Sequence, residues 1–321
     1  MVEDAHASLA AAPELRAAGP GPGVDALRRA YLDLLRLVVT DLAGVATTSV
    51  GALPDGGVMA RELRGDGRRL RAAGMDWPLH GLTMVGLRRL EDLQACVERI
   101  VADGVPGDVI EAGAWRGGAS LLIRATLDAL GDGRELVVAD SFAGFPSGDA
   151  DASVAHDFLV APLDEVREAF ARLGLDRGVT FVPGFFETTM AGLAGRSWAL
   201  VRLDADTYEP TRLALRALYP GLAAGGYLLI DDYGSFEGCR RAVDEFRAEH
   251  GISEPLEQVD FTCWRWRRTS SDPIDAGPIA STPVAARPAG EPVHVPTAEE
   301  LALGEQLAAR PPRGRRRWFG R

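Results

Sequence analysis

The 321-residue sequence contains no lysine, so all 35 of its basic residues are arginines. This absence excludes several chemistries that need a lysine side chain, among them Schiff-base catalysis, a lysine general base and the phosphate-binding lysine of a P-loop. A GC-rich coding sequence is the simplest source of the bias, because it favours Arg and Ala over Lys. The exclusions hold whatever the cause.

Cysteines and long apolar runs are also scarce. The three cysteines are isolated in the sequence, so they indicate neither a zinc site nor a disulfide framework. No apolar run approaches the ~18–20 residues that would cross a bilayer. The acidic start at residues 2–4 lacks the apolar region of a signal peptide. The sequence therefore predicts a cytoplasmic protein that does not bind membranes.

The charge balance is acidic, with a formal net charge of −11. A protein that binds nucleic acid generally needs a basic surface, so nucleic acid is not expected as a partner. Residues 310–321 are an exception because they are rich in arginine. Such a tail could touch an anionic surface, although a solvated terminus is the commoner explanation.

Composition and periodicity divide the chain into four predicted segments. Residues 1–22 are rich in Ala, Pro and Gly and are expected to be disordered. Residues 23–106 are expected to form a helical cap or lid. Residues 107–268 form the predicted main domain, and residues 269–321 form a Pro- and Ala-rich linker with the basic tail.

Within the main domain, buried apolar strands alternate with helices, which is typical of a doubly wound α/β fold. We predict a Rossmann-like, mostly parallel, seven-stranded sheet with an N-terminal helical cap. Strands are read at 108–113, 134–140, 179–183, 198–204, 225–231 and 258–267. Helices are read at 24–44, 87–102, 117–131, 162–173, 208–219 and 236–250.

The first of these strands runs into a glycine-rich turn, with Gly113, Gly117 and Gly118. Open α/β sheets bind ligands beyond the carboxyl ends of their strands, and glycine lets the backbone approach a ligand closely. The spacing is not G-x-G-x-x-G, so a dinucleotide is not predicted. Asp140 ends the next strand, where a carboxylate could accept hydrogen bonds from the ribose of a nucleoside cofactor. A purely structural turn is the alternative.

Two later strands also end in carboxylates, at Asp204 and at Asp231-Asp232. Because parallel strands end at the same edge of the sheet, these three side chains are expected to lie together. Carboxylate oxygens suit Mg²⁺, and no histidine accompanies them, which disfavours zinc. The alternative is that these aspartates only cap helices.

In combination, these segments resemble the macrocin (TylF-type) sugar O-methyltransferases, which are class I S-adenosylmethionine-dependent enzymes. The similarity covers roughly residues 28–268. It rests on YLDLL at 31–35, LTMVG at 82–86, GDVIEAGAWRGG at 107–118, DSFAGFP at 140–146, PGFFET at 183–188, LDADTY at 203–208 and GGYLLIDDY at 225–233.

The resemblance implies which residues hold the cofactor. The glycine-rich turn would hold its methionine part, the segment after the second strand its ribose and adenine, and residues 83–84 would cover it. The predicted cofactor-binding residues are Thr83, Met84, Glu111, Ala112, Gly113, Ala114, Trp115, Asp140, Ser141, Phe142 and Phe186. The metal ligands of the family fall on Asp204, Asp231 and Asp232.

The implied reaction is methyl transfer from a sulfonium to a sugar hydroxyl, which is a poor nucleophile at neutral pH. Mg²⁺ would lower the pKa of the hydroxyl and could hold both hydroxyls of a vicinal diol. A general base must then take the proton. Asp204, Asp206 and His80 are candidates, and the resemblance favours Asp204 as both ligand and catalytic base.

The predicted function is therefore a Mg²⁺- and S-adenosylmethionine-dependent O-methyltransferase. Its partner would be a small-molecule acceptor, a deoxysugar of a glycosylated natural product such as an antibiotic. A phenolic or polyketide hydroxyl is an alternative acceptor, and an NAD-binding oxidoreductase is a more distant alternative. The apolar stripe over residues 24–44 predicts a homo-oligomer. Ala205 stands where the family often has Gly, which leaves the acceptor open.

Overall fold

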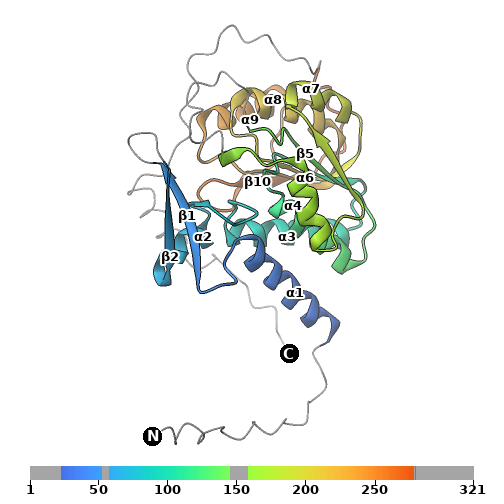
Figure 1. The fold of residues 1–321 in the computed structure, drawn as a ribbon. Helices are drawn as coiled ribbons and strands as arrows, with labels where there is room; N and C mark the ends of the chain where they lie inside the picture. Colours follow the sequence, from blue (N-terminus) through green and yellow to red (C-terminus); the bar gives the residue numbers. More distant parts are fainter. Residues whose placement is uncertain (1–22, 53–57, 145–157, 278, 280–321) are drawn as a thin grey trace, which may run out of the picture.

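A seven-stranded sheet forms the centre of the structure (Figure 1). The computed structural model describes residues 23–52, 58–144, 158–277 and 279. The strands are β4 (Asp108–Ala112), β5 (Leu136–Asp140), β6 (Val179–Pro183), β7 (Trp198–Leu203), β8 (Leu222–Ile230), β9 (Glu257–Gln258) and β10 (Trp264–Arg267). Their order is β6-β5-β4-β7-β8-β10-β9. The strands from β6 to β8 are parallel, whereas β10 is antiparallel to both β8 and β9.

Helices cover both faces of this sheet. They are α1 (Val24–Val39), α3 (Leu87–Ala102), α4 (Gly118–Leu130), α6 (Leu163–Arg172), α7 (Phe186–Thr189), α8 (Tyr208–Leu218) and α9 (Glu237–Glu249). The first four pack into one hydrophobic core and the last three into another. Side chains alternate along each strand, so Val109 lies in the first core and Ile110 in the second.

The predicted Rossmann-like fold and its mostly parallel, seven-stranded sheet are confirmed. The predicted strand 258–267 is wrong in one respect, because it is two short strands, β9 and β10. Between them, the Asp260 carboxylate accepts hydrogen bonds from the backbone amides of Thr262 (3.0 Å) and Cys263 (2.8 Å). An aspartate that binds its own backbone in this way favours a turn over an extended ladder.

The N-terminal region is only partly helical. α1 ends at Val39, five residues before the predicted end, because Asp41 adopts a left-handed conformation (φ 57°) that cannot continue a helix. A three-stranded antiparallel sheet follows, in the order β2-β1-β3. It consists of β1 (Ala46–Ala52), β2 (Val58–Arg64) and β3 (Trp77–Pro78), with α2 (Arg68–Ala73) beside it. Short 3-10 turns lie at Gly65–Gly67, Met190–Leu193 and Tyr219–Gly221.

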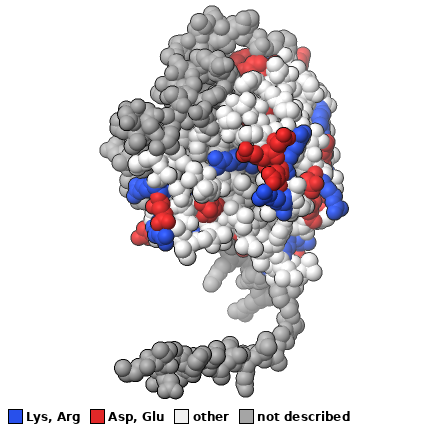
Figure 2. Space-filling view, in the orientation of Figure 1, with Lys and Arg blue, Asp and Glu red and all other residues white. Residues whose placement is uncertain are grey.

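The outer side of α1 is apolar. Val24, Leu27, Tyr31, Leu34 and Val38 are exposed and recur at spacings of three and four. Figure 2 shows mostly uncharged surface over this helix, whereas charges of both signs alternate over α6. The expected homo-oligomer stays a prediction.

The structure tests two further expectations only in part. None of the helices in the described ranges is long and apolar enough to span a bilayer. The predicted disordered segment 1–22 and the part of the predicted linker and basic tail that covers residues 280–321 lie outside the described residues.

Candidate active site

The glycine-rich turn after β4 packs directly against the end of β7. Gly113 has a φ of 93°, and a Cβ on it would overlap the backbone oxygen of Asp204. The amide of Gly113 donates to Ala139 O (2.8 Å), and the amide of Asp204 donates to Ala112 O (2.8 Å). β4 and β7 lie at the point where the strand order reverses, which is where open α/β sheets bind ligands.

Asp140 joins the two loops on the other side of this turn. Its Oδ2 accepts hydrogen bonds from the backbone amides of Ala114 (2.7 Å) and Trp115 (2.8 Å), and its Oδ1 accepts one from Phe142 (2.7 Å). Trp115 and Phe142 both have positive φ angles, of 48° and 54°. The carboxylate therefore holds two strained turns in place. Its predicted contact with a ribose would use the lone pairs that these amides leave free.

A pocket that is open to solvent lies beside these loops. Six predicted cofactor residues line it: Met84, Gly113, Trp115, Asp140, Ser141 and Phe186. The other lining residues are Gly144, Leu159, Phe185, Glu187, Asp204, Ala205, Asp206 and Pro210.

The remaining predicted cofactor residues are not among the residues that line this pocket. Thr83 is buried and accepts a hydrogen bond from the amide of Val85 (3.0 Å). Glu111 is buried beneath α4, where it accepts a hydrogen bond from the Ser120 hydroxyl. Ala112, Ala114 and Phe142 are buried as well. Phe185 and Glu187 line the pocket and belong to the PGFFET motif, but they were not predicted as site residues. Leu159 and Pro210 also line the pocket, and neither lies in one of the motifs.

The segment that precedes Thr83 packs against the glycine-rich turn. The Arg116 guanidinium donates hydrogen bonds to the carbonyls of Pro78 (3.2 Å), Leu79 (3.0 Å) and Gly81 (3.0 Å). It also lies over the Trp115 ring, at 4.2 Å from the centroid. His80, a candidate base, is exposed and does not line the pocket.

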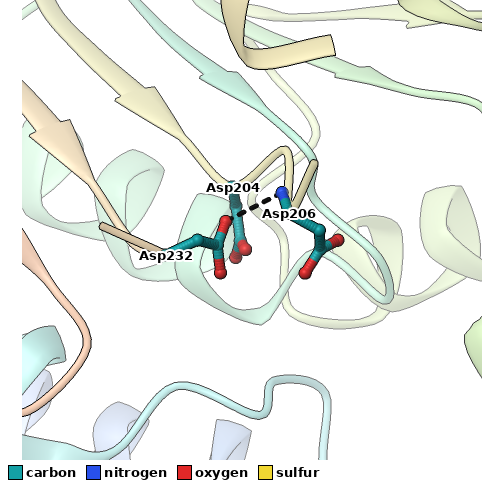
Figure 3. Close-up of side chains that lie close together, drawn as sticks. All are labelled: Asp204, Asp206 and Asp232. Carbon is teal, nitrogen blue, oxygen red and sulfur yellow. Dashed lines mark hydrogen bonds between the residues drawn. The ribbon is translucent and has the colours of Figure 1, made fainter. Parts of the chain in front are cut away.

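Three carboxylates meet at the rim of the sheet: Asp204, Asp206 and Asp232 (Figure 3). One oxygen from each lies within 4.8 Å of the others. The backbone amide of Asp206, which has a φ of 53°, donates to Asp232 Oδ2 (2.9 Å). This bond ties the turn after β7 to the end of β8.

The local electrostatics favour a cation in this cluster. Burial, with the neighbouring Asp231, raises the pKa of Asp204 to about 6. Burial, with the charges of Asp204, Asp231 and Asp140, raises the pKa of Asp206 to about 8. Burial and the same kind of repulsion raise the pKa of Asp232 well above its ordinary value. Burial is the largest cause of each shift, and repulsion between the carboxylates adds to it.

Asp231 lies apart from this cluster. Its Oδ1 accepts a hydrogen bond from Arg202 Nη2 (2.5 Å), and its Oδ2 accepts one from Arg89. Although burial acts in the opposite direction, these two arginines hold the pKa of Asp231 below its ordinary value. The cluster therefore contains Asp206, whereas the predicted metal ligand Asp231 lies outside it.

Comparison with known proteins identifies the family to which the chain belongs. Residues 29–268 match the macrocin O-methyltransferase (TylF) family. The chain belongs to the macrocin O-methyltransferase family. The resemblance drawn from the motifs is confirmed, and this macrocin-type protein is an S-adenosylmethionine-dependent O-methyltransferase.

Individual relatives of this macrocin O-methyltransferase family member are similar over most of their length. The chain is 43% identical over 259 residues to the 8-demethyl-8-(2,3-dimethoxy-alpha-L-rhamnosyl)-tetracenomycin-C 4'-O-methyltransferase of Streptomyces olivaceus, covering 76% of this chain and 94% of that protein. It is 38% identical over 265 residues to the mycinamicin III 3''-O-methyltransferase of Micromonospora griseorubida, covering 78% and 99%. The solved structure of the O-methyltransferase NovP is similar with a TM-score of 0.66 and 35% identity, covering 76% of this chain and 100% of that one.

Proposed function

We propose that this enzyme methylates a hydroxyl of a sugar carried by a natural product, with the help of Mg²⁺. The observation that carries the proposal is that the acidic cluster and the glycine-rich turn meet at one pocket, which both Gly113 and Asp204 line. The names of the relatives support the acceptor class, because they describe a rhamnosyl tetracenomycin and mycinamicin III.

The cofactor end of the pocket would be built by Met84, Gly113 and Trp115 on one side and by Asp140 and Ser141 on the other. The backbone comes close at Gly113, where no side chain fits. When bound, S-adenosylmethionine supplies a methyl group on a positively charged sulfur. The residues of the chain would hold that group facing the aspartates and exclude water from the line of transfer.

The metal end would be built by Asp204 and Asp232, with Asp206 as the third carboxylate. The donor set fits Mg²⁺, since it offers only hard oxygen atoms and leaves positions for water or an acceptor. When bound, the cation supplies a Lewis acid that lowers the pKa of a nearby hydroxyl. Asp206 would hold the Asp232 carboxylate in place through its backbone amide.

For the proton, we propose Asp204 as the general base. Its carboxylate lines the pocket and belongs to the acidic cluster, so a general base at this position would lie beside an activated hydroxyl. Asp206 is a second candidate, because it lines the same pocket and belongs to the same cluster.

The acceptor is expected to carry two adjacent hydroxyls, because a cation with open positions can hold both. The test is methyl transfer, followed by mass spectrometry, to a glycoside with a vicinal diol and to the matched deoxy glycoside. We expect kcat/KM at least ~10²-fold lower for the deoxy compound, since a site built to bind a hydroxyl rejects an analogue without it. Equal rates would contradict the diol, and preferred methylation of a catechol would favour the phenolic alternative.

A further inference from the structure

Arg202 lies at the centre of a buried charge network beneath α3 and α4, just behind the pocket. Only 3% of its side chain is exposed. Its Nη1 donates to Glu111 Oε1 (2.5 Å) and to Asp204 Oδ2 (3.0 Å), and its Nη2 donates to Asp231 Oδ1 (2.5 Å). One guanidinium thus joins three carboxylates that come from three neighbouring strands.

The register of the sheet places these residues together. Glu111 on β4 is the direct partner of Arg202 on β7. Side chains two residues apart on a strand point to the same face, which brings Arg202 beside Asp204. Asp231 follows β8, and its amide donates to Leu203 O (2.9 Å), so it lies level with Asp204. The network is therefore fixed by strand pairing and not by a flexible loop.

A second arginine holds Asp231 from the opposite side. Arg89 on α3 pairs with Asp231 and, through Nε, with Asp260 (3.0 Å). It also donates from Nη2 to Gly74 O (3.2 Å). Because both oxygens of Asp231 are engaged by arginines, Asp231 in turn fixes the plane of the Arg202 guanidinium.

In the described part of the chain, Arg202 is the hydrogen-bond donor to the Asp204 carboxylate. That bond engages Oδ2, and one oxygen of the same carboxylate belongs to the acidic cluster. We propose that Arg202 is a positioning residue for methyl transfer, which orients the Asp204 carboxylate toward the cation and the acceptor. The inference rests on the proposed function and adds a residue that does not line the pocket.

A guanidinium is required at this position because of its shape. Its two terminal nitrogens face three carboxylates at once from a rigid plane. A lysine would keep the positive charge, but its single nitrogen on a flexible chain cannot reach all three groups. The cofactor turn has independent support, since Asp140 holds the amides of Ala114 and Trp115. Loss of the guanidinium should therefore disturb Asp204 more than the cofactor turn.

The test is Arg202→Lys, with Arg196→Lys as the matched control. Arg196 precedes the same strand and pairs with Asp108 (3.0 Å) and Glu135 (2.7 Å), but at the opposite end of the sheet. Calorimetry of S-adenosylhomocysteine, calorimetry of Mg²⁺ on the complex with S-adenosylhomocysteine, kcat on a glycosylated acceptor and Tm are measured for each.

For Arg202→Lys we expect a Kd for Mg²⁺ at least ~10-fold higher and a kcat ~10–100-fold lower, the range found when a partner of a metal ligand is changed. The Kd of S-adenosylhomocysteine should change much less, because Asp140 holds the cofactor turn separately. Arg196→Lys should match the wild type in its Kd for Mg²⁺, its kcat and its Kd for S-adenosylhomocysteine. If Arg202→Lys does not fold, Arg202→Lys/Glu111→Gln removes one of the three carboxylates that Arg202 pairs with, and the same changes in Mg²⁺ affinity and kcat are expected.

A lower Tm with unchanged Mg²⁺ affinity and unchanged kcat would assign Arg202 to folding alone and overturn the proposal. Failure of the proposed function looks different, because the wild type itself would then bind no Mg²⁺. In that case the kcat of Arg202→Lys is the deciding measurement. A lower kcat with unchanged S-adenosylhomocysteine affinity would still support a positioning role, whereas an unchanged kcat would overturn the proposal.

Discussion

Asp204→Asn is expected to lower the rate of methyl transfer by at least ~10³-fold, because a general base alone contributes ~10²–10⁴-fold. Asp204 belongs to the acidic cluster, lines the pocket and directly follows the strand next to the glycine-rich turn. The asparagine keeps the shape and can still accept a hydrogen bond from Arg202, so the fold should survive. It cannot take the proton, and it binds a cation more weakly.

The measurement is single-turnover methyl transfer with a glycosylated acceptor, together with calorimetry of S-adenosylhomocysteine. The affinity for S-adenosylhomocysteine should change little. Asp164→Asn is the matched control, since Asp164 is an exposed residue on α6, with 96% of its side chain accessible. A rate for Asp204→Asn within tenfold of the control would contradict the role that we give to Asp204.

Gly113→Ala is expected to abolish cofactor binding and to lower the free energy of unfolding by at least ~3 kcal/mol. Two effects add here. The φ of 93° is strained for any residue with a Cβ, and the added Cβ would overlap the backbone of Asp204, which cannot rotate away. Relief of the overlap would push the ends of β4 and β7 apart at the pocket.

Gly131→Ala separates the two effects. Gly131 ends α4 with a φ of 71°, but nothing lies within 4 Å of an added Cβ. Gly131→Ala should therefore lower the free energy of unfolding only by the backbone strain, ~1–2 kcal/mol, and it should leave cofactor binding intact. Urea unfolding and calorimetry of S-adenosylhomocysteine measure both. Equal stability of the two variants, with binding retained in Gly113→Ala, would refute the close approach of the two strands.

The sequence predicted most of the sheet because each parallel strand is an apolar run that ends at a glycine or an aspartate. Predicted bounds of the helices after α1 differ from the observed ones by one residue at most, for example 237–249 against 236–250 for α9. β1 and β2 were missed, because the run ATTSVGA is rich in small residues and lies beside glycines. Their pairing to each other, from Ala46–Arg64 to Ala52–Val58, is visible only in the fold.

For the site, strand ends predicted that the aspartates gather at one rim, but not which carboxylate faces which neighbour. Asp231 and Asp232 are adjacent in sequence and have different partners, because consecutive side chains leave a strand in different directions. Asp231 is paired by Arg89, 142 positions away in sequence. No motif marks such a pair, and only the packing of α3 on β8 creates it. Asp206 belongs to the cluster because its backbone amide donates a hydrogen bond to the Asp232 carboxylate.

The cation proposed at Asp204, Asp206 and Asp232 is expected to activate the acceptor. The most direct measurement is the initial rate of methyl transfer to a glycosylated acceptor by protein stripped with a chelator, followed by titration with Mg²⁺. We expect a rate at least ~10²-fold lower without the cation and saturable recovery on adding it, whereas S-adenosylhomocysteine binds throughout. Full turnover in excess chelator would contradict the account.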